Sequence, residues 1–483
     1  MAYKAPGVYI EEASVYPRSV AEVETAVPAF IGYTEIAKQR DAVLTQQPTR
    51  INSIVEYEQL FGGPARPETI SITLDASNRP TKVTVKHHYL LYYSLRLFFD
   101  NGGSSCYIVS VGGYASNGYK AKVDLEAGID SVHKVDEPTL LLFPDAVLMG
   151  ADDLTALQRK ALLQCATRQD RFGVFDLDET VSHRAGVTAF RNNIGSDNLK
   201  YGAVYTPHLH TTIPIQYIYQ DITLVSTGSV ALVLADITKA AGLDATAVTT
   251  INKAIGNNDS QDDINKLALK LERTNTVFAS IVTAIQNEGV ILPPSSAVVG
   301  IYAKVDNDRG VWKAPANITL NSVKDLSEHI GNAAQRTLNV DLNSGKSINA
   351  IRTFPGKGTL IWGARTLAGN DKEWRYIPTM RFFNMVEESV KKSTEWAVFE
   401  PNTAALWSNL KNMIKNYLLR KWREGALQGS KPEDSFYVRV GLGENMSSLD
   451  ILEGRLIIEV GMAMVRPAEF ITLRISQKSR NPE

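Results

Sequence analysis

The stretch that most constrains the fold is a helix-like segment near residue 100 that leads straight into a strand-like one. Tyr89 to Phe99 is apolar and rich in aromatic residues, and it ends at Asn101-Gly102-Gly103, where glycine favours the end of a helix. The apolar run Cys106 to Val111 follows directly and has the length of a buried strand. A helix, a glycine turn and a buried strand form one half of an α/β layer.

The same alternation continues along the chain. Short apolar runs typical of buried strands recur at Leu140–Phe143, Phe172–Asp176 and Tyr201–Tyr205, and an amphipathic helix is expected over Leu154–Arg168. At 483 residues the chain is several times longer than the roughly 100–150 residues of one domain. We therefore predict a multidomain α+β (mixed α/β) protein, with one or more α/β domains over residues 27–346.

Two regions depart from this alternation. Residues 231–285 are rich in Ala and Thr and helical in pattern, which predicts a helical excursion on the surface. Residues from Ile348 to Ile475 contain strand-like runs at both ends and a long helix between them, with polar residues scattered rather than clustered. We expect this C-terminal block, residues 347–483, to be an assembly module, and residues 1–26 to be a terminal arm and linker.

Strand-like segments lie at both ends of the chain. Val8–Glu12 has no hairpin partner beside it, and the run from Phe470 to Ile475 is separated from the preceding strand by Pro467. Their unpaired backbone groups need the edge of another sheet, which predicts strand addition between subunits and growth into rings or filaments. The expected strand residues are Val8, Tyr9, Ile10, Glu11, Phe470, Ile471, Leu473 and Ile475.

The predicted helix over Asn402–Glu424 is basic. Its five cations and one acid give 5 − 1 = +4, in a chain whose net charge is −1. The charge could dock an acidic protein surface or a nucleic acid, or it could simply face solvent. Of the two partner options, nucleic acid is the weaker one. The candidate contact residues are Lys411, Lys415, Arg420, Lys421 and Arg423.

Residues that could carry chemistry are sparse. The histidine pairs His87-His88 and His208/His210 lack acidic or cysteine partners at metal-ligand spacing, and Asp176–Glu179 is more typical of a charged turn than of a cation site. Gly356–Gly358 lacks the spacing of a phosphate loop. We expect no catalytic, cofactor or metal residues, and a metal-dependent α/β enzyme using these groups is the less favoured alternative.

The expected compartment follows from the cysteines and the N-terminus. Cys106 and Cys165 are too few for a disulfide framework, so buried free thiols in a reducing compartment are expected. The N-terminal residues lack the apolar core of a secretory signal, and no stretch approaches the roughly 20 apolar residues of a membrane span. We expect synthesis in the bacterial cytoplasm and no direct membrane insertion.

Several motifs occur in order across almost the whole chain: Pro6–Glu12, Val27–Gly32, Phe98–Gly103, Asp306–Asn317, Trp362–Thr366 and Phe399–Asn402. In this combination the sequence resembles the sheath protein of contractile tails, both of phages and of phage-tail-like contractile injection systems. The segment 231–285 matches that pattern less well.

The resemblance implies a structural subunit of an assembled particle. Such subunits stack as hexameric rings around an inner tube and shorten on a signal from the baseplate, so that the tube is driven through a target envelope. The implied partners are further copies, the tube protein, and baseplate and terminator or cap proteins, without nucleic acid or nucleotide. A static, non-contractile tube or capsid-like protein is the alternative.

The resemblance also implies an architecture. The terminal segments together form a discontinuous inner domain, into which the outer domains are inserted, and both termini extend as arms that add strands to neighbouring sheets. Carried onto this sequence, the arms are about residues 5–12 and 468–477. The inner domain combines the N-terminus with residues 347–483, and its basic helix faces the tube.

Overall fold

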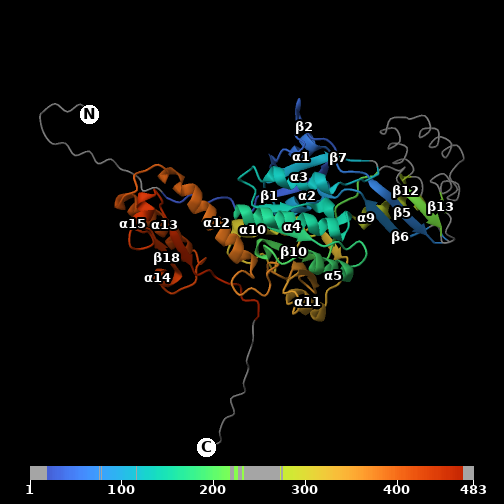
Figure 1. The fold of residues 1–483 in the computed structure, drawn as a ribbon. Coiled ribbons are helices and arrows are strands. Elements are labelled where there is room, and N and C mark those ends of the chain that lie inside the picture. Colours follow the sequence, from blue (N-terminus) through green and yellow to red (C-terminus); the bar gives the residue numbers. More distant parts are fainter. Residues whose placement is uncertain are drawn as a thin grey trace, which may run out of the picture. The chain divides into compact units, whose positions relative to one another are not determined.

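The chain forms two compact units. The computed structural model describes residues 19–470 except 76, 78, 116, 218–221, 227–230, 233–271 and 274–275. The smaller unit comprises the chain up to Val23 together with Met385–Arg466, and the larger unit comprises Glu24–Asn384 and the chain from Pro467 onward. The chain therefore passes between the units three times. Helices and strands both contribute substantially, which confirms the mixed α/β class (Figure 1).

The larger unit is built on an eight-stranded sheet with the order β17-β16-β10-β9-β8-β1-β7-β4. The pairs from β7 through β16 are parallel, whereas β4 and β17 are antiparallel edge strands. The strands are β1 (Pro28–Thr34), β4 (Thr49–Ile51), β7 (Cys106–Gly113), β8 (Leu140–Leu142), β9 (Phe172–Asp176), β10 (Gly202–Thr206), β16 (Asn349–Phe354) and β17 (Gly358–Ile361).

Helices cover both faces of this sheet, as expected for parallel strands joined by crossovers. Phe30 of β1 packs its ring edge-on against Phe98 of α2, whereas a Cβ on Gly128 of α3 would meet Ile31. Successive strand residues point to opposite faces, so α2 and α3 lie on opposite sides. The helices of this unit are α1 (Ile54–Phe61), α2 (Leu91–Asp100), α3 (Lys122–Val132), α4 (Ala151–Arg168), α5 (His183–Asn193), α9 (Thr276–Glu288), α10 (Ser295–Arg309) and α11 (Asn332–Asn339), with 3-10 turns η1 (Pro144–Leu148) and η2 (Leu199–Tyr201).

Smaller sheets flank the main one in the larger unit. A four-stranded sheet joins β5 (Pro67–Leu74), β6 (Pro80–His87), β12 (Ile222–Ser226) and β13 (Ala231–Leu232). A three-stranded sheet joins β11 (Leu209–Thr211), β14 (Ile291–Leu292) and β15 (Val323–Leu326), and β2 (Lys38–Gln39) pairs with β3 (Ala42–Val43). Most of the predicted excursion at 231–285 lies outside the described residues. Its described end is helical, in α9.

The smaller unit is mainly helical. Its elements are the second half of α12 (Ile377–Thr394), η4 (Glu395–Ala397), α13 (Ala404–Arg423), α14 (Pro432–Ser435), β18 (Phe436–Arg439), α15 (Ser448–Leu452) and β19 (Glu459–Met462). β18 and β19 pair antiparallel, with Val438 opposite Val460. β19 is the strand that the sequence predicts before Pro467.

The compact smaller unit starts later than the predicted assembly block. β16 pairs in parallel with β10, placing Tyr205 opposite Asn349, and β17 pairs with β16, so these two strands belong to the sheet of the larger unit. The division falls inside α12, at Met385. The predicted inner domain, which combines the N-terminus with residues 347–483, is an arrangement expected in the assembled particle. It stays a prediction.

Candidate assembly surface

The predicted basic helix exists as α13, and one side of it is buried. Leu410, Ile414 and Leu418 are fully buried, and the helix packs against β18. These positions are spaced four residues apart, the spacing at which side chains share one face of a helix. The apolar stripe that these residues form is therefore the side that faces the unit's core.

Lys421 lies inside the unit rather than on the open face. It continues the buried stripe because it follows Tyr417 by four residues, and its side chain is 5% exposed. Its ammonium group lies 2.5 Å from Glu22 and 2.7 Å from Glu424. This cation holds the N-terminal segment and the end of α13 together, so it is not available to a partner in this conformation.

Two further cations of α13 have intramolecular contacts. Lys411 Nζ lies 2.7 Å from both carboxylate oxygens of Glu444, and this contact holds the pKa of Glu444 below its ordinary value. Arg420 is exposed, but its Nη2 donates to the carbonyl of Val20 at 3.4 Å and its guanidinium lies 5.6 Å from the centre of the Tyr417 ring.

Lys415 and Arg423 are exposed and form no ion pair within the described part of the chain. They share the open side of α13 with uncharged polar side chains, namely Ser408, Asn409, Asn412 and Asn416. The surface that α13 offers to a partner is thus mostly amide side chains with a few cations. It is less positive than the sequence-derived charge of the whole helix.

The start of the described chain is held on the smaller unit. The N–H of Ala21 donates to Ser393 Oγ and that of Val23 to Ser389 Oγ, each at 3.1 Å, and Val20 is buried. Both serines lie on α12. The predicted arm residues Val8, Tyr9, Ile10 and Glu11 lie outside the described residues.

The β18–β19 sheet has only two strands. In the part of the chain that the structure describes, no third strand pairs with either of them. The outer edge of such a sheet carries backbone N–H and C=O groups that can pair with an added strand. Of the predicted C-terminal strand residues, Phe470 is described and is 74% exposed. Ile471, Leu473 and Ile475 lie outside the described residues.

The polar groups of the enzyme alternative hold loops in place. Asp176 is buried at the end of β9 and accepts from the N–H and Oγ of Ser295 at 2.7 and 2.5 Å, and burial raises its pKa to about 6. Glu179 accepts from the Thr206 hydroxyl at 2.5 Å and from the His208 N–H at 3.1 Å. Among the described residues no three acidic, histidine or cysteine side chains are grouped so that they could hold a metal ion.

His87 is neutral and unpaired. Both of its ring nitrogens are buried without a hydrogen-bond partner, and its ring packs edge-on against Tyr93. Burial, followed by the neighbouring His88, lowers the pKa of His87 to about 4. The sequence does not reveal this environment, because a pattern of residue types does not show which ring nitrogen finds a partner.

A buried carboxylate that sequence reasoning missed is Asp145. The parallel strands run β7-β1-β8-β9-β10, an order that reverses between β1 and β8, and sheets of this kind bind ligands at the strand ends beside that point. Asp145 lies there and accepts from the N–H groups of Tyr33, Leu90 and Leu91 at 2.9, 2.6 and 3.1 Å. The protein's own carboxylate thus takes the N–H groups at the start of α2.

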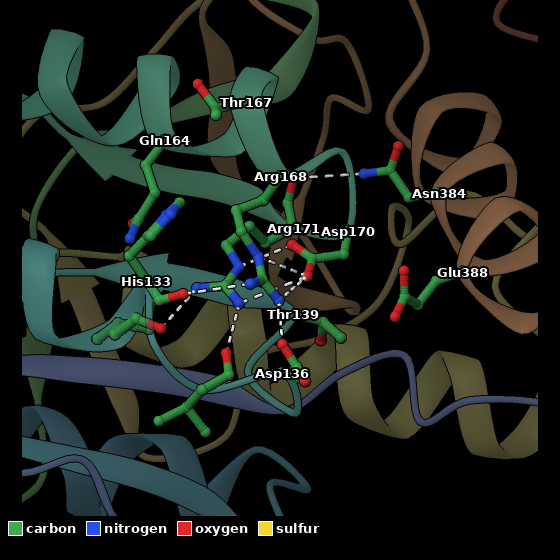
Figure 2. A network of polar contacts seen from close by, with 12 residues as sticks. His133, Asp136, Thr139, Gln164, Thr167, Arg168, Asp170, Arg171, Asn384 and Glu388 are labelled. Atoms are coloured by element: carbon green, nitrogen blue, oxygen red, sulfur yellow. Dashed lines mark hydrogen bonds and ion pairs between the residues drawn. The ribbon is translucent and has the colours of Figure 1, made fainter. Parts of the chain in front are cut away.

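A second buried charge network joins α4 to β9 (Figure 2). Arg171 is fully buried, and its Nε donates to Asp170 at 2.8 Å while its Nη atoms donate to the carbonyls of Val132 and Val135 at 2.9 and 2.6 Å. Arg168 also contacts Asp170, at 2.7 Å. The two arginines are thus paired with Asp170, and Arg171 also binds two backbone carbonyls, so the network fixes the end of α3 to the start of β9.

Comparisons with known proteins identify the family of the chain. The family model for the phage tail sheath C-terminal domain matches residues 369–478. Over 99% of its length the chain is similar to a protein from the contracted helical sheath of the anti-feeding prophage, at 30% identity and a TM-score of 0.61, and it covers all of that chain. The chain belongs to the contractile tail sheath family.

Further matches support membership of the sheath family. A chain of the contracted sheath complex of an extracellular contractile injection system, PVC, is 28% identical, with a TM-score of 0.64 and 99% of both chains covered. The putative prophage major tail sheath protein of Pseudomonas aeruginosa is 22% identical over 184 residues, which is 38% of this chain and 45% of that protein. The chain spans between 19% and 52% of the length of the curated sheath relatives that it matches.

In the described part of this sheath family member, no helix has both the length and the apolar character of a membrane span.

Proposed function

We propose that the protein is a sheath subunit that stacks as hexameric rings around an inner tube and shortens to drive that tube through a target envelope. The proposal rests on family membership and on the similarity to sheath proteins solved in a contracted state. The subunit would act within a phage tail or an injection-system particle, together with tube, baseplate and terminator or cap proteins. It would need no nucleotide, because the energy would come from new contacts between subunits.

The β18–β19 sheet is the structural observation that supports linkage between subunits. It is a two-stranded sheet with no third strand among the described residues, in a chain whose two ends are strand-like in sequence. Two strands alone are marginally stable in water, so added strands would both complete the sheet and link the subunits. We propose that the segments around Val8–Glu11 and Phe470–Ile475 of neighbouring copies are those strands.

The open side of α13 is the proposed contact with the tube. Lys415, Arg420 and Arg423 would meet acidic groups there, and the asparagine side chains would donate and accept hydrogen bonds. A surface of this kind suits a partner against which the subunit must form and break contacts, since it lacks a large apolar area.

The test is assembly with the tube protein encoded alongside it. Co-expression should give long sheathed particles in electron micrographs, and two sheath lengths should appear after a chemical trigger. Deleting residues 2–12 should abolish ordered sheath while the subunit stays folded, with a same-length deletion in the excursion, residues 246–256, as the control. Subunits that stay monomeric with every partner present would rule out the sheath role. A single sheath length under all conditions would leave a static tube.

A further inference from the structure

The C-terminal segment begins with residues 467–470, and the carboxylate of Glu469 in this stretch is bound by side chains of the larger unit. Glu469 accepts from Arg365 twice, from Nε at 2.9 Å to one oxygen and from Nη2 at 2.7 Å to the other. Asn339 Nδ2 donates to the first oxygen at 2.6 Å, and the Tyr376 hydroxyl donates to the second at 3.1 Å. Three side chains from separate parts of the sequence thus converge on one carboxylate.

The donors of this site are themselves fixed. The Arg365 side chain is 4% exposed, and its Nη1 also donates to the carbonyls of Asn339 and Gly369 at 3.3 Å each. The Arg365 N–H donates to Asn349 Oδ1 at 2.8 Å, and Asn349 belongs to β16 of the eight-stranded sheet. The carboxylate is therefore connected to the main sheet through a short series of hydrogen bonds.

The charges of Glu469 and Arg365 favour a stable ion pair. Burial raises the pKa of Glu469, but the hydrogen bonds from Arg365 and Asn339 outweigh burial and keep that pKa below its ordinary value. The carboxylate is then ionised at neutral pH. A paired, nearly buried guanidinium that loses its partner becomes an uncompensated charge, so the contact is costly to break. The bidentate geometry also fixes the direction in which Glu469 approaches.

The two terminal segments are rooted in different units. Residues 19–23 are held on α12 and α13 of the smaller unit, through Val20, Glu22 and the two backbone contacts described above. The C-terminal segment leaves the smaller unit after Arg466 and reaches the carboxylate site three residues later. Phe470 follows at once and is exposed.

We propose that Arg365, Asn339 and Tyr376 form an anchor site that fixes the C-terminal segment to the larger unit at Glu469, whereas residues 20–23 fix the N-terminal segment to the smaller unit. In the particle, a neighbour that binds the C-terminal strand would then be attached to the larger unit. The second statement rests on the proposed sheath function. The anchor itself is a property of the single chain.

The anchor is tested on the isolated subunit. Glu469→Gln keeps the size of the side chain but removes its charge and one acceptor. Hydrogen exchange in peptides covering residues 464–470 should then become at least about tenfold faster, the factor that corresponds to losing about 1.4 kcal/mol of local stability. Glu453→Gln is the matched control, since Glu453 pairs with Arg455 at the surface at 2.7 Å. Exchange within twofold of the wild type in the folded Glu469→Gln variant would overturn the anchor.

Assembly tests the second statement separately. Wild-type and Glu453→Gln subunits should form sheath equally, whereas Glu469→Gln subunits should form at least about tenfold less ordered sheath at equal concentration. If Glu469→Gln exchanges faster yet assembles like the wild type, the anchor does not govern attachment and that statement fails. If the wild type forms no sheath with any partner, the sheath function fails, and the exchange measurement still decides the anchor.

Discussion

Asp176 and Ser295 are joined by two hydrogen bonds, one from the backbone N–H of Ser295 to Oδ1 at 2.7 Å and one from its hydroxyl to Oδ2 at 2.5 Å. The contact connects the end of β9 to the first residue of α10. Desolvation nevertheless dominates, because the carboxyl is buried and its pKa is raised to about 6. The ionised form of Asp176 therefore weakens the fold at neutral pH.

We expect Asp176→Asn to stabilise the protein at neutral pH. The amide can accept the Ser295 N–H and donate to its hydroxyl, so both contacts survive without a buried charge. Between the ordinary pKa of 3.8 and the folded value of about 6, the native state holds a proton that the unfolded state has lost, so wild-type stability falls as pH rises. The free energy of unfolding of the variant, measured with urea, should exceed that of the wild type by about 1–3 kcal/mol at pH 7.5. At pH 4 the two should be almost equal. Asp130→Asn, at an exposed ion pair with Lys160, is the control. An equal gain at both pH values would contradict the assignment.

We expect Gly32→Ala to destabilise the larger unit. A Cβ at Gly32 would lie 2.5 Å from Asp145 Oδ2 and would push away the carboxylate that holds three backbone N–H groups. The cost should be about 2–4 kcal/mol, from overpacking and lost hydrogen bonds together. Gly113→Ala is the control, because nothing lies within 4 Å of its added Cβ. Equal melting temperatures for the two variants would show that the close approach has little energetic weight.

Acid should weaken the wild type partly through His87. Its pKa in the folded state, about 4, is below the ordinary value of 6.5. Between these two pH values the unfolded state binds a proton that the native state does not bind. The contribution of His87 to the free energy of unfolding is fully present above pH 6.5. It decreases by about 1–3 kcal/mol as the pH falls towards 4. His87→Phe should preserve the contact with Tyr93 and reduce the loss of stability between pH 7 and 4.5. An unchanged pH profile, measured by urea unfolding, would exclude this role.

Reversing charge on the open side of α13 should impair assembly without unfolding the subunit. Lys415→Glu with Arg423→Glu should change the free energy of unfolding by less than about 0.5 kcal/mol, because both side chains are exposed. The amount of sheath assembled on the tube should decrease for this variant. It should also decrease for the wild type at high salt, because salt screens the charges. Lys421→Ala is the contrasting variant. It should destabilise the subunit because it leaves Glu22 and Glu424 without their shared cation. Normal assembly by the double reversal would place the tube contact elsewhere.

The sequence predicts the strands and helices of the main sheet well, since they carry strong local signals. β9 matches its predicted bounds, and α4 ends at Arg168, as predicted. The unit boundary could not be predicted, because the pairing of β16 with β10 joins residues about 145 positions apart and leaves no local signal.

The candidate site was predictable in outline and not in detail. The amphipathic pattern of α13 gives the helix and its buried side, but the fate of each cation depends on Glu22 and Glu444, which lie elsewhere in the chain. Asp145 and Glu469 gave no signal, since an isolated acid beside a proline or an alanine is common at a turn. Their donors come from distant segments, and only the folded chain brings them together.

Because the chain passes between the units three times, the smaller unit is built from segments that are synthesised at very different times. Glu22 leaves the ribosome hundreds of residues before Lys421, and the larger unit's sheet is translated in between. The smaller unit, including the β18–β19 pair, can therefore be completed only after β19 has emerged. Until then the chain lacks the two-stranded sheet at which we propose that neighbouring copies add strands, so the proposed strand addition must follow the synthesis of β19.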